Sequence, residues 1–162
     1  MPLRPPRIVL DTNTLLRGLV SRSSPAARVR RGAEQRKFVL LLSKPVLDEY
    51  RHVLGDDLLR DRFPELTPEL VELTIRRLRF VGDYLRSPRV RFRYPRDPRD
   101  EKFIELAVAL GATDIISADQ DLLSLPTSRS EAGKRFRQRL PDVRVVSAGT
   151  FVRDFPSDNL PN

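Results

Sequence analysis

The chain has 162 residues, of which 40% are hydrophobic and 32% charged, a composition typical of one globular domain. It contains no cysteine and one histidine, which excludes disulfide scaffolds, thiolate metal sites and multi-histidine metal cages. Thirty Lys+Arg against 22 Asp+Glu give a net charge of +8, which favours a polyanionic partner but also serves solubility. Any chemistry must therefore rest mainly on carboxylates, hydroxyls and basic side chains.

No apolar run approaches the roughly 20 residues that span a bilayer, and the N-terminus lacks the apolar stretch of a secretory signal. We therefore expect a cytoplasmic protein that does not contact a membrane. No repeat or linker divides the sequence, so residues 1–155 are predicted to form one domain, followed by a short tail at 156–162.

Short apolar runs alternate with stretches of helical period. In chain order, the predicted elements are a strand at 8–10, helix 24–35, strand 38–42, helix 43–54, helix 67–85, helix 97–111, strand 115–118 and strand 143–146. Three of the helices begin at a capping residue followed by proline, as in Ser24-Pro25. Between 90 and 94, apolar residues alternate with arginines, which indicates an extra strand or an extended connection. Strands separated by helices predict an α/β fold with a central, mostly parallel sheet flanked by helices.

Two acidic residues follow predicted strands directly. Asp11 comes after the strand at 8–10, and Asp119 comes after the strand at 115–118. Ligand sites in parallel sheets lie beyond the carboxyl ends of the strands, so these two carboxylates are expected to converge. Each is also a plausible helix cap or turn residue.

Two further acids occupy unusual positions on helices. Glu49 lies at the edge of the apolar stripe of the helix that starts at Ser43. Asp100 precedes Phe103 and Ile104 by three and four residues, so it shares their buried face. Its alternative is an ordinary first-turn acid, which the helix dipole favours.

Gathering several carboxylates in one buried place is costly, because like charges and desolvation both raise their pKa values. A divalent cation removes that conflict, and oxygen-only ligands suit Mg²⁺ or Mn²⁺ rather than zinc. Such an ion polarises a phosphoryl oxygen and activates a bound water. Converging acids on a basic chain therefore predict metal-dependent phosphodiester hydrolysis.

Four segments in this order also match a known family. They are IVLDTNTLL (8–16), SKPVLDEY (43–50), DPRDEKFIELA (97–107) and SADQDLL (117–123). Together they span residues 7 to about 125, and the ordered set resembles the PIN-domain nucleases. The resemblance implies a PIN-like fold and endonucleolytic cleavage of single-stranded RNA with one or two Mg²⁺ or Mn²⁺ ions.

Carried over to this sequence, the resemblance assigns catalysis and metal binding to Asp11, Glu49, Asp100 and Asp119. It assigns supporting roles to Thr12, Asn13, Ser117 and Asp121. The polar residues among these are equally explained as ordinary turn or cap residues. The family includes toxins of toxin–antitoxin pairs, which often form homodimers and are held inactive by an acidic antitoxin. The resemblance thus implies a toxin with an antitoxin partner.

Basic residues provide candidate RNA contacts. The segment 127–141 is longer and more basic than the family's usual connection, and it is either a phosphate-gripping lobe or a solvated helix face. Its candidates are Arg129, Lys134, Arg135 and Arg137. Arg17 is either a contact to the scissile phosphate or an exposed helical arginine. Phe136 either stacks on a base or packs in the core.

Two other functions fit the sequence less well. A phosphatase that forms an aspartyl-phosphate would use a motif like Asp11-Thr12-Asn13-Thr14, but that class has a second Asp where Asn13 stands. A catalytically silent PIN-like module would bind RNA or a protein without cutting. Because all four acids are present, the preferred interpretation is a metal-dependent endoribonuclease that acts as a toxin.

Overall fold

The computed structural model describes residues 4–155, and the predicted tail at 156–162 lies outside them. These residues form one α/β domain around a five-stranded sheet whose order is β3-β2-β1-β4-β5. Its strands are β1 (Arg7–Leu10), β2 (Val39–Ser43), β3 (Asp83–Leu85), β4 (Asp114–Ile116) and β5 (Arg144–Val146). Every neighbouring pair is parallel, which confirms the predicted fold class.

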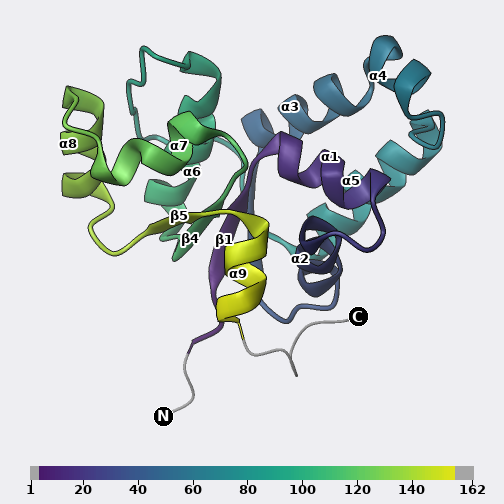
Figure 1. The fold of residues 1–162 in the computed structure, drawn as a ribbon, viewed down its shortest axis with the longest axis horizontal. Helices are drawn as coiled ribbons and strands as arrows, with labels where there is room; N and C mark the ends of the chain where they lie inside the picture. Colours follow the sequence, from purple (N-terminus) through teal and green to yellow (C-terminus); the bar gives the residue numbers. More distant parts are fainter. Residues whose placement is uncertain (1–3, 156–162) are drawn as a thin grey trace.

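Helices cover both faces of the sheet. On one side lie α1 (Thr12–Val20), α2 (Pro25–Glu34), α3 (Lys44–Leu54), α4 (Asp57–Arg62) and α5 (Pro68–Val81). On the other side lie α6 (Glu101–Leu110), α7 (Gln120–Ser124) and α8 (Glu131–Arg139), as Figure 1 shows. The last helix, α9 (Ala148–Asp154), packs against α2. Two 3₁₀ turns, η1 (Pro98–Asp100) and η2 (Leu125–Thr127), precede α6 and follow α7.

The predicted helix starts follow from local capping. The side chains of Ser24, Ser43 and Thr67 each accept a hydrogen bond from the backbone N–H three residues on, and proline follows within the first two helical positions. Gly111 ends α6 in the left-handed conformation with φ 67°, which favours glycine. The predicted helices at 24–35, 43–54 and 97–111 are thereby confirmed, although the last begins as η1.

The predicted helix 67–85 is wrong at its C-terminal end. It stops at Val81, and the chain then turns into β3, which pairs with β2. At Gly82 a Cβ atom would lie 2.6 Å from a Leu42 methyl and 2.8 Å from the Leu78 carbonyl oxygen. The absence of a side chain at Gly82 therefore lets the chain pass close to β2 and join the sheet.

The residues around Phe92 form an extended connection without becoming a strand. The N–H of Phe92 donates to Glu105 Oε1 at 3.0 Å, and the N–H of Tyr94 donates to Glu101 Oε1 at 2.8 Å. Side chains of α6 thus replace a neighbouring strand as acceptors. Phe92 and Tyr94 are buried, while the alternating arginines are exposed.

The core centres on β1 and β2, whose residues Ile8, Val9, Leu40 and Leu41 are almost fully buried. Burial on both faces is expected for a parallel sheet covered by helices on both sides. Within residues 4–155, no helix combines the length and the apolar character needed to cross a bilayer.

Candidate metal and active site

A cavity of about 240 Å³ opens beyond the carboxyl ends of β1 and β4, and we call it the acid cavity. Its carboxylates belong to Asp11, Glu49, Asp97, Asp100 and Asp119. The four acids named from the sequence therefore line one cavity, together with a fifth. Their catalytic and metal-binding roles remain predictions.

Asp11 is both a helix cap and a member of the cavity. Only 5% of it is exposed, and its Oδ1 accepts the Thr14 N–H at 2.8 Å as the N-cap of α1. Its Oδ2 accepts the hydroxyl hydrogen of Ser117. Behind it, the Tyr50 hydroxyl donates to the Leu10 carbonyl oxygen at the end of β1. The capping and cavity-lining alternatives for Asp11 are thus compatible, because one carboxylate satisfies both.

Ser117 links two of the predicted acids. Its buried hydroxyl donates to Asp11 and accepts the Asp119 N–H at 3.0 Å. Asp119 in turn caps α7, since its Oδ1 accepts the Asp121 N–H at 2.9 Å. The predicted strand at 115–118 ends at Ile116, which leaves Ser117 and Ala118 to carry the chain toward Asp119. Ser117 therefore fixes the distance between Asp11 and Asp119.

Three carboxylates approach one another most closely. Asp97, Asp100 and Asp119 each offer an oxygen, and these oxygens all lie within 4.8 Å of one another. Asp97 was not selected from the sequence, where it serves only as a capping signal before proline. It does cap η1, because its Oδ1 accepts the Arg99 N–H at 3.1 Å. In a 3₁₀ turn, residues three apart lie on the same side, so the spacing of Asp97 and Asp100 could have indicated that Asp97 lies beside Asp100.

Asp100 carries the strongest electrostatic perturbation in the cavity. Its Oδ2 is buried and has no hydrogen-bond partner among the described residues. Burial, together with the nearby carboxylates of Asp97, Asp119 and Asp11, raises the pKa of Asp100 to about 7. When protonated, Asp100 can share its hydrogen with Asp119, which raises the pKa further. Asp100 therefore exchanges between its protonated and ionised forms near neutral pH.

Two cations pair with carboxylates of the cavity wall. The Nζ of Lys102 lies 2.9 Å from Glu49 Oε2, and the two side chains are 23% and 21% exposed. Arg99 lies 3.2 Å from Asp97 and is largely exposed. The sequence analysis identified neither residue. Lys102 offsets part of the negative charge of the acid cavity, so Glu49 is held by an ion pair as well as by its helix.

The predicted supporting residues divide between cavities. Thr12 and Asn13 line the acid cavity, Thr12 with a buried hydroxyl that lacks a partner among the described residues, and Asn13 with an exposed side chain. Asp121 instead forms an ion pair with Arg96 at 2.9 Å and lines the two neighbouring cavities. Asp121 is therefore a neighbour of the acid cavity rather than part of its wall.

An open groove of about 720 Å³ continues from the acid cavity, and we call it the arginine groove. Its polar and aromatic members include Asn13, Arg17, Arg62, Phe63, Asp119 and Asp121. The guanidinium of Arg62 lies 5.3 Å from the centre of the Phe63 ring. Arg17 is thus an exposed helical arginine that also borders the predicted site.

The basic segment 127–141 folds largely as α8, with Ala132, Gly133 and Phe136 buried and most of its cations exposed. Phe136 packs edge-to-face against Phe92, so the packing alternative holds for this residue. Arg137 donates to the carbonyl oxygens of Pro126 and Ser128, and Lys134 pairs with Glu131. Arg135 donates to the Arg93 carbonyl oxygen. Contacts of these residues and of Arg129 to RNA remain predictions.

A sequence model described as "PIN domain" matches residues 7–121, which include every carboxylate of the acid cavity. The match covers well over half of the chain, so the protein belongs to the PIN domain family, and the predicted resemblance is confirmed. PIN domains are generally nucleases that use divalent metals, which agrees with an acidic cluster at this position. No curated protein and no solved structure matched the chain.

Proposed function

We propose that this protein is an endoribonuclease that requires Mg²⁺ or Mn²⁺ and hydrolyses phosphodiester bonds of single-stranded RNA. The observation that carries the proposal is the trio of Asp97, Asp100 and Asp119, whose oxygens lie within 4.8 Å of one another. An acidic trio is a common surface feature, but here Asp100 also presents a buried oxygen without a partner among the described residues. A cation would satisfy that oxygen and relieve the repulsion among the three.

The donor set fits a hard divalent ion. Asp97, Asp100 and Asp119 would hold the metal, with Asp11 and Glu49 binding directly or through water, and all of these ligand atoms are carboxylate oxygens. When bound, the ion polarises a phosphoryl oxygen and lowers the pKa of a coordinated water. The role of Asp97 is new relative to the four acids named from the sequence.

The chain's own groups prepare this site before any ion binds. The Thr14 N–H and the Ser117 hydroxyl hold Asp11, and the Asp121 N–H holds Asp119, so neither carboxylate has to reorganise. Fixed charges of this kind stabilise a developing transition state without a reorganisation cost. Lys102 holds Glu49 in an ion pair until a metal or substrate competes for it.

The choice of RNA as substrate is supported by charge and shape. The net charge is +8, and the arginine groove leads to the acid cavity with Arg17 and Arg62 on its walls. Cations along a groove follow a phosphate backbone, and aromatic rings such as Phe63 suit unpaired bases. A single strand that enters the groove would pass Asp119 with its phosphates exposed to the acids.

A cleavage assay tests the proposal. A fluorescent single-stranded RNA is incubated with the purified protein and Mg²⁺ or Mn²⁺, with and without EDTA, beside Asp11→Asn. We expect cutting by the wild type with the cation alone, and its loss in the variant. Asp114→Asn is the matched control, because Asp114 is also a buried aspartate but lies at the opposite end of β4. Binding of RNA without cutting would favour the silent module instead.

We also propose that the nuclease is the toxin of a toxin–antitoxin pair, that it acts in the cytoplasm as a homodimer, and that an acidic protein inhibits it. The sequence resemblance and the basic surface support this. Induced expression should arrest growth, and Asp119→Asn should not. Growth unaffected by an active enzyme would separate the toxin role from the nuclease activity.

A further inference from the structure

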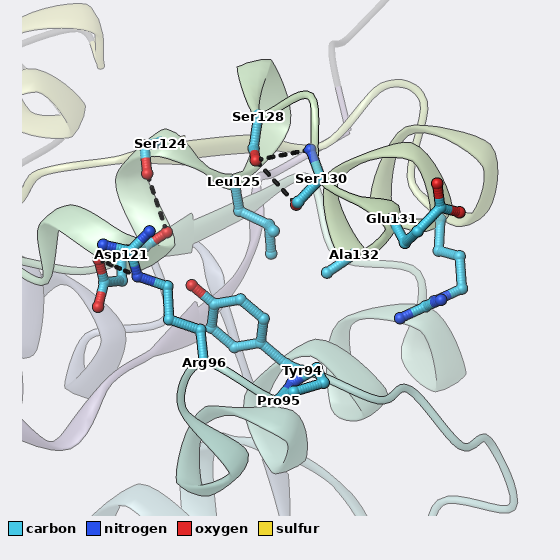
Figure 2. A pocket seen from close by; sticks show the side chains of 11 residues that line it. Tyr94, Pro95, Arg96, Asp121, Ser124, Leu125, Ser128, Ser130, Glu131 and Ala132 are labelled. Atoms are coloured by element: carbon cyan, nitrogen blue, oxygen red, sulfur yellow. Dashed lines mark hydrogen bonds and ion pairs between the residues drawn. The ribbon is translucent and has the colours of Figure 1, made fainter.

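A third cavity, of about 270 Å³, shares the wall residue Asp121 of α7 with the arginine groove, and we call it the tyrosine cavity (Figure 2). Its wall includes Tyr94, Arg96, Asp121, Leu125, Ala132 and Arg135. Asp121 borders both this cavity and the arginine groove, and its N–H binds the Asp119 carboxylate. The tyrosine cavity and the acid cavity thus have wall residues, Asp121 and Asp119, that lie two positions apart in the chain.

The inner wall of the tyrosine cavity is apolar. Tyr94, Leu125 and Ala132 are 3%, 2% and 8% exposed, and Figure 2 shows their side chains directed toward one central space. At about 270 Å³ the space lies just below the roughly 300–1,000 Å³ of pockets that hold a drug-sized molecule. One planar ring system fits it better than a whole nucleotide does.

The rim of the cavity offers hydrogen bonds and positive charge. Ser124, Ser128 and Ser130 place hydroxyl groups there, each of which can donate or accept. The Ser128 hydroxyl donates to Ser130 Oγ at 2.8 Å, so these two are already oriented. Arg96 and Arg135 supply a cation from the connection before η1 and from α8.

We propose that the tyrosine cavity takes up one unpaired nucleobase of the RNA strand, close to the phosphate that is cut, and so gives the nuclease a base preference. The inference rests on the proposed function and adds a specificity site to it. The apolar wall holds the faces of the base, the hydroxyl groups bind its edge, and Arg96 and Arg135 contact the flanking phosphates.

The place of this cavity in the chain supports a role in specificity. Ser124, Leu125 and the cavity residues on α8 lie beyond residue 121, where the family match ends. The acids that define the chemistry lie inside the matched stretch, whereas most of the tyrosine cavity does not. The segment 127–141 thus shapes a recognition site, to which it contributes one cation, Arg135.

A binding experiment without divalent metal tests the inference separately from cleavage. The four nucleoside 5′-monophosphates are titrated into the wild-type protein in EDTA by calorimetry. We expect one base to bind about tenfold more tightly than the weakest, a difference of 1.4 kcal/mol. Ala132→Leu, which fills the cavity, should reduce that affinity about tenfold.

A second pair of variants tests the inference independently if Ala132→Leu does not fold. Arg135→Gln removes a cation from the cavity, while Arg139→Gln makes the same change on the same helix outside the cavity wall. We expect weaker binding for the first and unchanged binding for the second. Equal affinity for all four bases, no binding at all, or equal effects of the two variants would overturn the inference.

Cleavage products of a random single-stranded RNA provide the second readout. The wild type with Mg²⁺ should show one preferred base at a fixed position from the cut, and Ala132→Leu should weaken that preference, whereas Arg135→Gln should slow cutting at every base alike. Cutting without any base preference would overturn the inference and leave the proposed function intact. Base-selective binding without any cutting would instead contradict the proposed nuclease function.

Discussion

Lys102 Nζ lies 2.9 Å from Oε2 of Glu49, a wall residue of the acid cavity, although 53 residues separate them in the sequence. The pair joins α3 to α6 and places a positive charge where the site is expected to bind a cation. A bound metal and Lys102 would repel each other and compete for Glu49.

Removing this cation should therefore strengthen metal binding. In Lys102→Met, we expect Mn²⁺ affinity to increase about fivefold or more, because the repulsion of two positive charges a few ångströms apart is worth about 1–3 kcal/mol at a protein surface. The same change should lower the thermal stability of the metal-free protein, because Glu49 loses its partner. Calorimetry and thermal unfolding measure the two effects, and weaker Mn²⁺ binding in the variant would contradict this role for Lys102.

Asp100 should make the metal-free protein less stable as pH rises. Its pKa is about 7 in the folded protein, against roughly 4 when unfolded, so between these values the unfolded chain has released a proton that the folded chain retains. Stability therefore falls as pH rises from about 4 to 7. Asp100→Asn should match the wild type at pH 4 and exceed it by roughly 1–2 kcal/mol at pH 8, which is less than the roughly 4 kcal/mol of the full pKa shift because Asp100 is partly exposed and solvent screens its charge. Denaturant unfolding at both pH values checks this, and identical pH profiles would contradict it.

Metal binding should show the opposite trend with pH. Only ionised carboxylates coordinate, so Mg²⁺ has to displace the proton that Asp100 holds below pH 7. We expect the thermal stabilisation by a fixed Mg²⁺ concentration to be small at pH 5.5 and to increase through pH 7.5. Stabilisation that is independent of pH in this range would exclude Asp100 as a ligand.

Asp114 is a buried aspartate outside the acid cavity, so it separates effects on stability from effects on metal binding. It is 4% exposed and pairs with Arg144, whose Nη2 lies 2.7 Å from Asp114 Oδ1. Asp114→Asn should lower the free energy of unfolding by about 1–3 kcal/mol, since Arg144 is half exposed and keeps Asp154 as a partner. Its metal affinity should equal that of the wild type, and calorimetry on the folded variant provides that comparison.

RNA affinity should depend steeply on salt, because phosphate contacts release counterions. Arg17→Gln in the arginine groove should reduce the slope of log affinity against log salt by about 0.7. Arg77→Gln, an exposed arginine on α5, is the control and should leave the slope unchanged. A flat salt response of the wild type would show that the basic excess does not serve RNA binding.

Much of this fold could be predicted because its signals are local. Buried strands appear as short apolar runs, and Ser24, Ser43 and Thr67 mark helix starts by capping. Strand β3 could not be predicted, because three residues are too few to show a periodic pattern of hydrophobic residues. It joins the sheet through the close packing at Gly82. Helices α1, α4, α7 and α9 were also not predicted, because they are short and none of them begins with a capping residue followed by proline.

The sequence could predict that two of the acids lie close together, because sheet topology alone brings them together. Asp11 and Asp119 follow strands that pair directly, so one edge of the sheet brings them together. Asp97 was missed because its capping role already explained it. Lys102 was missed because helical periodicity does not indicate which helices will touch.

The most direct test of the central claim is a calorimetric titration of Mn²⁺ into the wild type, Asp119→Asn and Asp114→Asn at pH 8. The carboxylates of the acid cavity predict binding of one or two ions by the wild type and by Asp114→Asn, and loss of that binding in Asp119→Asn. Absence of binding to the wild type, or unchanged affinity in Asp119→Asn, would contradict a metal site built on these acids.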